Sequence, residues 1–521
     1  MVVMKISSQN ISTIQELVSN FDSLGNHPAI ICGNISLSYS DFYSAITKLS
    51  SILSDLDFRK GDRVILMNSH RLASLIGIYS VMYAGGIAVP ISTKSTNKEI
   101  EYVLDDSNSS ILITDENFHF SKLANYESLT SIIEITFSGN SSKSHKQIIS
   151  FNPLGSNQKL NEVPKISSTD EALILYTSGT SGEKKGVLLT HSNLVETSKY
   201  MNNFMKITPE IREFIAVPLS HAFGFGRTRS VLLAGGTIIV ENGKFNPLNT
   251  LEIIKKTKCN AISSVSTVFI ILLDNYSKIL QNIGSDIKWI EIGSMPLSPD
   301  YKNKILKFFP KSRTHMNYGM TEAMRSTMIE FRSEKNKISS VGKASPNVEV
   351  KILDDKGNIL SPNNIGEIAV RGVNLAKGYW KKNNIWNSKI SSGWFKTDDV
   401  GFLDEDNYLT FVGRKDDLIN IGGEKVHPTE IEHELKNMFN GKNFCVCGID
   451  DPSNTFGQVP VICMEGKPTF EIEEIKNLLN EKLSAYKLPR EIYYFSELPM
   501  TENMKVKRKV IIEMIKNREY S

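Results

Sequence analysis

A loop rich in glycine and hydroxyl residues, placed between two apolar runs, constrains this chain more than any other feature. It reads YTSGTSGEKKG over residues 176–186, after the apolar run 172–175 and before a second one, 187–189. Glycines permit positive φ, so successive backbone N–H groups can converge on an anion, while the hydroxyls, Lys184 and Lys185 add donors and positive charge. A flexible linker would lie between domains. The pattern instead predicts two buried strands joined by a loop that binds a polyphosphate.

The loop does not follow the pattern of nucleotide kinases and GTPases. That pattern, G-x-x-x-x-G-K-[ST], needs a lysine followed by a hydroxyl residue that helps to hold Mg²⁺. Here Gly182 is followed by Glu183, and Lys185 is followed by Gly186. We therefore predict a phosphate loop of another kind.

The balance of charge argues against a protein that binds nucleic acid through bulk charge. The 521 residues include 60 basic and 57 acidic side chains, for a net charge of +3. A nucleic-acid surface normally needs a clear excess of lysine and arginine. We expect no nucleic-acid partner, and the length predicts three or four structural units.

The cysteines predict a protein without a disulfide framework. They are few, odd in number and widely spaced: Cys32, Cys259, Cys445, Cys447 and Cys463. This usage fits a reducing cytoplasm. Cys445 and Cys447 alternate along an apolar run, so we expect them on one face of a strand, as small buried thiols rather than as metal ligands.

One uncharged stretch is long enough to span a membrane and needs another explanation. Residues 72–92 carry no charge, but Gly85 and Gly86 interrupt them. We predict a buried helix to about Ala84, a turn at the two glycines, and a strand over 87–91. With no signal-like segment at the N-terminus, we expect a soluble, cytoplasmic protein without a membrane span.

The order of apolar runs predicts an α/β fold in two domains. Strand and helix patterns alternate over 63–114 and again over 231–293, which indicates parallel sheets. The segment 341–412 alternates as an antiparallel sheet, which indicates a small barrel-like region. A shorter module follows. We expect an N-terminal domain, 1–415, with two helix-flanked sheets and a β-barrel-like region, and a smaller, mobile α+β C-terminal domain, 416–521.

Five segments in order resemble the motifs of one family. They are YTSGTSGEKKG (176–186), NYGMTEA (317–323), WFKTDDVG (394–401), GRKDDLINIGGEKVHPTEIE (413–432) and PMTENMKVKRK (499–509). The family is the adenylate-forming (AMP-binding) superfamily of acyl-CoA synthetases, stand-alone peptide-synthetase-type adenylation domains and luciferases. Because the resemblance covers nearly the whole chain with five motifs in register, it is specific.

The resemblance implies an ATP site built from several of these motifs. Its residues would be Thr177, Ser178, Gly179, Thr180, Ser181, Gly182, Lys185, Gly293, Tyr318, Gly319, Thr321, Asp399 and Arg414. Tyr318 would stack on adenine, Thr321 would meet the α-phosphate, and Asp399 would accept both ribose hydroxyls beside Arg414. Glu322 is a hard carboxylate suited to Mg²⁺. The usual Thr-Gly-Asp reads Thr-Asp-Asp here, so we expect Asp398 to be a turn residue.

The same resemblance implies roles in the C-terminal domain. Lys505 would neutralise charge that develops in the pentavalent transition state, although Met504 stands where the family normally has glycine. Asp416 would be the hinge on which the domain turns. Gly422 and Gly423 would let the backbone approach a pantetheine arm during thioester formation.

The segment after Pro218 carries the expected acyl site. His221 resembles the family histidine beside the acyl carboxylate, and Phe223 and Phe225 are expected to line an apolar acyl pocket. Arg227 and Arg229 either face solvent or meet a second acidic group of the acid, and the sequence leaves both readings open.

The reaction implied has two steps. A carboxylate attacks the ATP α-phosphate to give an acyl-adenylate and pyrophosphate, and a thiol then takes the acyl group. No acidic residue occurs between Pro218 and Gly236 to pair with an ammonium, which argues against an α-amino acid. We expect a ligase that uses ATP and Mg²⁺, with CoA as the thiol. The alternatives are a ligase that loads a carrier protein's phosphopantetheine and a non-catalytic ATP-binding homologue.

Overall fold

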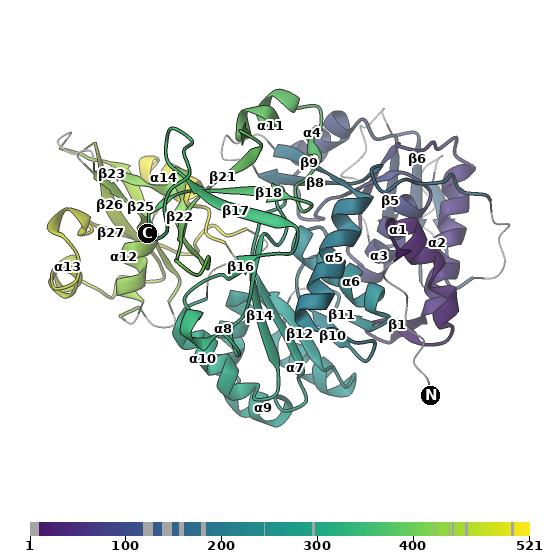
Figure 1. Cartoon of the computed structure of the whole chain (residues 1–521), viewed down its shortest axis with the longest axis horizontal. Coiled ribbons are helices and arrows are strands. Elements are labelled where there is room, and N and C mark those ends of the chain that lie inside the picture. The colour runs from purple at the N-terminus through teal and green to yellow at the C-terminus, as the bar shows by residue number, and fades with distance from the viewer. Residues whose placement is uncertain are drawn as a thin grey trace. The chain divides into compact units, whose positions relative to one another are not determined.

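The computed structural model describes most of the chain. The described residues are 10–117, 129–137, 148–155, 161–178, 184–243, 245–293, 297–421, 424–436, 438–439, 442–453, 457–501 and 505–520. They divide into two compact units (Figure 1), the first made of Met1–Glu349 and Val370–Gly393, the second of Val350–Ala369 and Trp394–Ser521. The domain boundary at 415/416 stays a prediction.

A nine-stranded sheet in the first unit has the order β16-β15-β14-β13-β12-β10-β11-β1-β2. Its strands are β1 (Pro28–Cys32), β2 (Ile35–Ser38), β10 (Arg212–Ile215), β11 (Thr237–Val240), β12 (Ala261–Val265), β13 (Trp289–Gly293), β14 (Arg313–Tyr318), β15 (Thr327–Glu330) and β16 (Lys343–Ala344). The pairs from β1 through β14 are parallel, and β2, β15 and β16 add antiparallel edges. The alternation over 231–293 therefore forms the predicted parallel sheet.

An eight-stranded sheet in the same unit has the order β19-β9-β8-β4-β3-β5-β6-β7. Its strands are β3 (Arg63–Met67), β4 (Ile87–Pro90), β5 (Ile111–Asp115), β6 (Ser131–Ile135), β7 (Ile148–Phe151), β8 (Glu171–Ser178), β9 (Lys184–Thr190) and β19 (Gly378–Tyr379). Strands β8 and β9 pair antiparallel, so the two apolar runs around the glycine-rich loop form a buried hairpin.

Helices flank both sheets. They are α1 (Ile14–Ser19), α2 (Tyr39–Ser54), α3 (Arg71–Tyr83), α4 (Asn97–Ser107), α5 (His191–Met205), α6 (Ala222–Ala234), α7 (Pro247–Lys256), α8 (Ser266–Asn275), α9 (Ser277–Ile283), α10 (Pro299–Phe308) and α11 (Asn383–Lys389). Ser38 and Thr190 cap α2 and α5 with reciprocal side-chain bonds, as capping boxes do. The uncharged stretch forms α3 and β4 with Gly85 at φ +88° between them, and no helix of the described residues could cross a bilayer.

Helix α6 was not predicted from the sequence. It contacts α5 and strands β10 and β11 (Figure 1), and every residue from Gly224 to Leu233 is buried. A helix that is buried on all sides has no polar face, so its sequence lacks the amphipathic period by which helices are recognised.

The second unit contains antiparallel strands and a small α+β module. Its elements are β17 (Val348–Leu353) and β18 (Gly366–Gly372), both shared with the first unit at one end, then β21 (Trp394–Leu403), β22 (Leu409–Arg414), β23 (Ile419–Ile421), β24 (Glu424–Val426), α12 (Pro428–Leu435), β25 (Phe444–Asp450), β26 (Gln458–Glu465), α13 (Ile472–Asn480), β27 (Ile492–Phe495) and α14 (Arg508–Lys516). The short strand β20 (Ile390–Ser391) belongs to the first unit. The mixed α/β fold expected from the sequence is confirmed.

The core of the small module contains three thiols. Cys445 and Cys447 share one face of β25, with their sulfurs 3.8 Å apart, as predicted. Cys463 of β26 is the register partner of Cys445. All five cysteines of the chain are buried free thiols. The three in this module pack among valine, isoleucine and leucine side chains, where cysteine behaves as a small apolar residue.

Candidate active site

The carboxyl ends of the parallel strands in the nine-stranded sheet carry three of the predicted site residues. Gly293 ends β13 and Tyr318 ends β14. The segment after β10 leads to His221, the half-buried residue that precedes α6. Ligands of open α/β sheets bind at this edge, so one edge of the sheet brings these residues into one region.

Phe223 lies against this edge. A Cβ on Gly293 would come within 3.3 Å of the Phe223 ring, so the glycine allows the ring to approach the β13 backbone. The guanidinium of Arg325 lies 5.6 Å from the centroid of the same ring. Phe223 is half-buried, whereas Phe225 is fully buried and packs on Tyr79 with ring centroids 5.6 Å apart.

The turn after β14 folds back on itself. Met320 and Ala323 exchange backbone hydrogen bonds of 3.2 and 3.1 Å, and a Cβ on Gly319 would lie 2.4 Å from the backbone nitrogen of Arg325. Only a glycine fits at position 319. The turn leaves Thr321 half-buried and Glu322 buried.

Tyr379 joins this turn to the phosphate-loop hairpin, and sequence reasoning missed it. Its hydroxyl donates to Oε1 of Glu322 at 2.8 Å, and Nζ of Lys185 lies 5.5 Å from its ring centroid. In β19, Tyr379 is the register partner of Val187 in β9. A two-residue strand has no detectable period, so the sequence offers no signal for it.

Helix α4 holds the hairpin from another direction. Lys184 forms an ion pair of 2.9 Å with Glu99, and Tyr176 donates to Asp106 at 2.6 Å. By contrast, Lys185 forms no ion pair with any residue that the structure describes. Of the two loop lysines, Lys185 is therefore the one whose charge is available to a phosphate.

Several predicted residues can be placed only in part. Thr177 and Ser178 are the register partners of Lys185 and Lys184 at the end of the hairpin. The remaining predicted residues of the phosphate loop and of the thiol channel lie outside the described residues: Gly179, Thr180, Ser181, Gly182, Gly422 and Gly423.

In the second unit, Asp399 and Arg414 form an ion pair. They are register partners on β21 and β22, with Nε of Arg414 3.0 Å from Oδ1 of Asp399. The aspartate side chain is 7% exposed and the arginine side chain 38%. Asp398 lies inside β21 rather than in a turn, but its φ is +61°. This left-handed conformation favours glycine and tolerates aspartate, which accounts for the Thr-Asp-Asp variant.

Lys505 lies within electrostatic reach of the same pair. The surrounding protein lowers the pKa of Lys505 below its usual value, Asp399 opposes this shift, and Arg414 adds to it. Thr501 forms two hydrogen bonds with the backbone of Lys505. Its N–H donates to the Lys505 carbonyl at 2.7 Å, and its Oγ1 accepts from the Lys505 N–H at 3.0 Å. Asp416 is half-exposed and lies 4.0 Å from Lys509.

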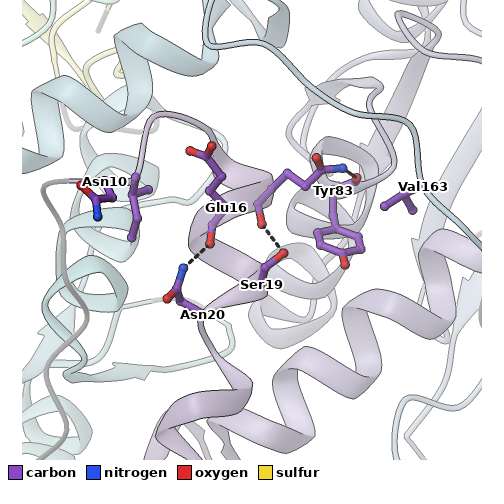
Figure 2. Close-up of a pocket in the computed structure, with 8 residues that line it drawn as sticks. Asn10, Glu16, Ser19, Asn20, Tyr83 and Val163 are labelled. Atoms are coloured by element: carbon purple, nitrogen blue, oxygen red, sulfur yellow. Dashed lines mark hydrogen bonds between the residues drawn. The ribbon is translucent and has the colours of Figure 1, made fainter.

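A surface cavity beside α1 contains none of these residues (Figure 2). It measures about 450 Å³ and is lined by Asn10, Glu16, Asn20, Tyr83 and Val163, among others. Gln15, Ser19 and Asn20 donate to nearby backbone carbonyls, to Tyr83 at 3.0 Å, to Gln15 at 2.9 Å and to Glu16 at 2.8 Å. We assign it no function.

Comparison with protein families gives a match to the model described as AMP-binding enzyme over residues 19–380. The match spans more than half of the chain. The chain belongs to the AMP-binding enzymes.

This AMP-binding enzyme matches known ligases over nearly their whole length. It is 28% identical to the long-chain-fatty-acid–CoA ligase of Bacillus subtilis, over 96% of this chain and 94% of the relative. It is 30% identical to the oxalate–CoA ligase of Saccharomyces cerevisiae, over 91% and 90%. The AMP-binding enzyme is accordingly an AMP-forming acid–thiol ligase.

A solved structure shares the fold of this AMP-binding enzyme. The o-succinylbenzoate CoA synthetase of Bacillus subtilis, solved with its acyl-adenylate intermediate, superimposes with a TM-score of 0.83 at 24% identity. The superposition covers 95% of this chain and 97% of that one.

Proposed function

We propose that this chain activates a carboxylic acid that lacks an α-ammonium group and transfers the acyl group to the thiol of CoA. The carboxylate oxygen attacks the ATP α-phosphorus, the bond to the β-phosphate breaks, and pyrophosphate leaves. The CoA thiol then attacks the acyl carbon, and AMP leaves. The observation that carries the proposal is the junction at Tyr379, which brings the phosphate-loop lysine and the Glu322 carboxylate to one side chain.

We assign the residues of the first unit as follows. Lys185 and the loop that it flanks bind the β- and γ-phosphates, and Tyr318 stacks on adenine at the end of β14. Thr321 contacts the α-phosphate. Glu322 is the residue that would hold Mg²⁺, because its carboxylate is buried, hard and oriented by the hydrogen bond from Tyr379. The ion would offset the negative charge of the phosphates.

We assign three residues of the second unit to the same reaction. Asp399 accepts the ribose hydroxyls, since a largely buried carboxylate already oriented by an arginine is an effective acceptor. Arg414 orients Asp399. Lys505 stabilises the charge that develops at the α-phosphate. In the thioester step, Asp416 acts as the hinge, and Gly422 and Gly423 admit the pantetheine arm.

The residues around α6 support the proposal that the substrate acid has no ammonium group. Two carboxylates, Glu213 and Glu291, lie beside this helix, but both are ion-paired with arginines. Neither is available to bind a substrate cation. The relatives are named for a fatty acid and for oxalate, which also lack an ammonium. His221 then lies beside the reacting carboxylate, and Phe223 borders the acyl group.

The location that we propose is the cytoplasm, because ATP and CoA are cytoplasmic metabolites. CoA is preferred to a carrier protein as acceptor because the relatives described above are named as CoA ligases.

The test is an assay of acid-dependent pyrophosphate and AMP release with a panel of fatty, aryl, hydroxy, dicarboxylic and α-amino acids. We expect release with a non-amino acid, and acyl-CoA formation when CoA is added. Strongest release with an α-amino acid would contradict the assignment of the acid. Release of AMP without any acyl-CoA, together with loading of an acyl carrier protein, would overturn the assignment of CoA.

A further inference from the structure

A cluster of buried charges surrounds the middle of α6. The guanidinium of Arg227 contacts Glu213 at 2.8 and 2.5 Å and Glu291 at 3.0 Å. Glu291 also pairs with Arg325 at 3.3 Å. Arg227 therefore faces neither solvent nor substrate, and the two carboxylates balance two of the guanidinium groups.

Arg229 is the third guanidinium of this cluster, and no residue that the structure describes is its counter-ion. Its side chain is 1% exposed, and neither Nη1 nor Nη2 has a hydrogen-bond partner among the described residues. Only Nε donates, to the carbonyl of Leu194 at 3.3 Å. With three buried cations and two buried anions, the cluster keeps one uncompensated positive charge, and it lies on Arg229.

An unpaired buried charge is costly, because water no longer solvates it and no protein group replaces the water. Burial lowers the pKa of Arg229 to about 9, with Arg325 adding to the shift, so the group is still a cation near pH 7. The phenols of Tyr79 and Tyr200 lie near it and are neutral at this pH, since burial raises the pKa of both. Among the described residues, no anionic group therefore neutralises the Arg229 cation.

The position of the cation relates it to the acyl site. One face of α6 carries Ala222, Phe225, Gly226 and Arg229, which are three, four and seven positions apart. The Arg229 guanidinium lies over Phe225, 4.7 Å from the ring centroid, because long helical side chains extend toward the N-terminus. The guanidinium is thus level with Phe225 on the helix axis. Phe225 is four residues after His221, so the guanidinium lies roughly 6 Å along the axis from His221.

Exposure decreases along the same helix. His221 and Phe223 are half-buried, whereas all residues from Gly224 to Leu233 are buried. The partly exposed end of α6 is therefore at His221, and Arg229 lies in its buried part.

We propose that Arg229 binds the second carboxylate of a dicarboxylic acid whose first carboxylate is adenylated. This inference rests on the proposed function and names its substrate class. A guanidinium binds a carboxylate through two parallel hydrogen bonds, and Nη1 and Nη2 are the two donors that lack partners. A separation of roughly 6 Å between the carboxylates corresponds to an unbranched diacid of roughly five to seven carbons.

The experiment compares acids matched in length. AMP formation by the full-length enzyme with ATP and CoA is measured for glutarate against pentanoate and for adipate against hexanoate. We expect kcat/KM to be about 30-fold or more higher for the diacid of at least one pair. Arg229→Met should bring the ratio near one by raising KM for the diacid, while Arg229→Lys should keep part of the preference.

The matched control is Ser230→Ala, the neighbouring buried residue of α6, which should leave the ratio unchanged. A wild-type enzyme that activates monocarboxylic acids as well as their matched diacids overturns the inference, whatever the variants do, and leaves the proposed function standing. An unchanged ratio in a folded Arg229→Met variant also overturns it. If no acid supports AMP formation, both the inference and the proposed function fail.

Discussion

Two ionic regions of this protein differ in what surrounds them. Around α6 in the first unit, Arg227 and its two glutamates are almost completely buried, with side-chain exposures of 0–2%. On β21 and β22 in the second unit, Arg414 is 38% exposed while Asp399 is 7% exposed. A buried pair supports the fold, because removing one partner leaves a charge without solvent or counter-ion. A pair open on one side can accept a ligand at little cost to stability.

The largest effect should come from breaking the buried region. Arg227→Met leaves Glu213 and Glu291 without their partner, and we expect a loss of about 3–5 kcal/mol in the free energy of unfolding. Urea denaturation measures it. The matched variant Arg414→Met should lose less than about 1 kcal/mol, because its pair is partly solvated. Equal losses in the two variants would remove the distinction between the regions.

The open region should matter for the reaction instead. Lys505→Ala should lower the rate of adenylation roughly 10²–10³-fold, about 3–4 kcal/mol, with little change in stability. Single-turnover pyrophosphate release measures the step. Lys507, an exposed lysine two residues away, is the control, and Lys507→Ala should retain the wild-type rate. Unchanged release in Lys505→Ala would remove this lysine from the mechanism.

A buried neutral side chain in the first unit should make stability depend on pH. His191 accepts a hydrogen bond from Ile14, and burial lowers its pKa to about 4. Between pH 6.5 and 4 the unfolded chain takes up a proton that the folded chain does not. Stability from this group is therefore complete above about pH 6.5 and falls by ~3 kcal/mol as the pH falls to 4. Unfolding of His191→Gln across this range should show a smaller loss, and parallel curves would contradict the prediction.

The smallest effect tests the junction at Tyr379. Tyr379→Phe removes the hydrogen bond to Glu322. We expect kcat/KM for ATP to fall roughly fivefold to thirtyfold, which corresponds to about 1–2 kcal/mol. The Mg²⁺ concentration that the reaction requires should rise. Tyr102→Phe is the control, because its hydroxyl donates to the backbone of Lys184 in the same hairpin. The Mg²⁺ requirement should not change in that variant. A rise in both variants would indicate damage to the hairpin rather than to the carboxylate.

Local patterns predicted much of the fold. The alternation of apolar runs and the two-residue period around Cys445 both depend on residues close in the chain. The same reasoning failed at α6, where burial on every side leaves no polar face. It also placed Asp398 in a turn. The structure instead has Asp398 within β21, with a positive φ.

The glycine-rich hairpin and the four later motifs determined the family, the ATP chemistry and the list of candidate residues. Each motif is a short, continuous stretch, so its residue types and their spacing can be recognised from the sequence. Only the tertiary structure decided which charges are already neutralised. Arg227 and Arg229 look alike in the sequence, two positions apart on one helix. The partners of Arg227 are Glu213 of β10, 14 residues away, and Glu291 of β13, farther along the chain. Those two strands supply no carboxylate to Arg229. Pairing of this kind depends on contacts that no local pattern encodes.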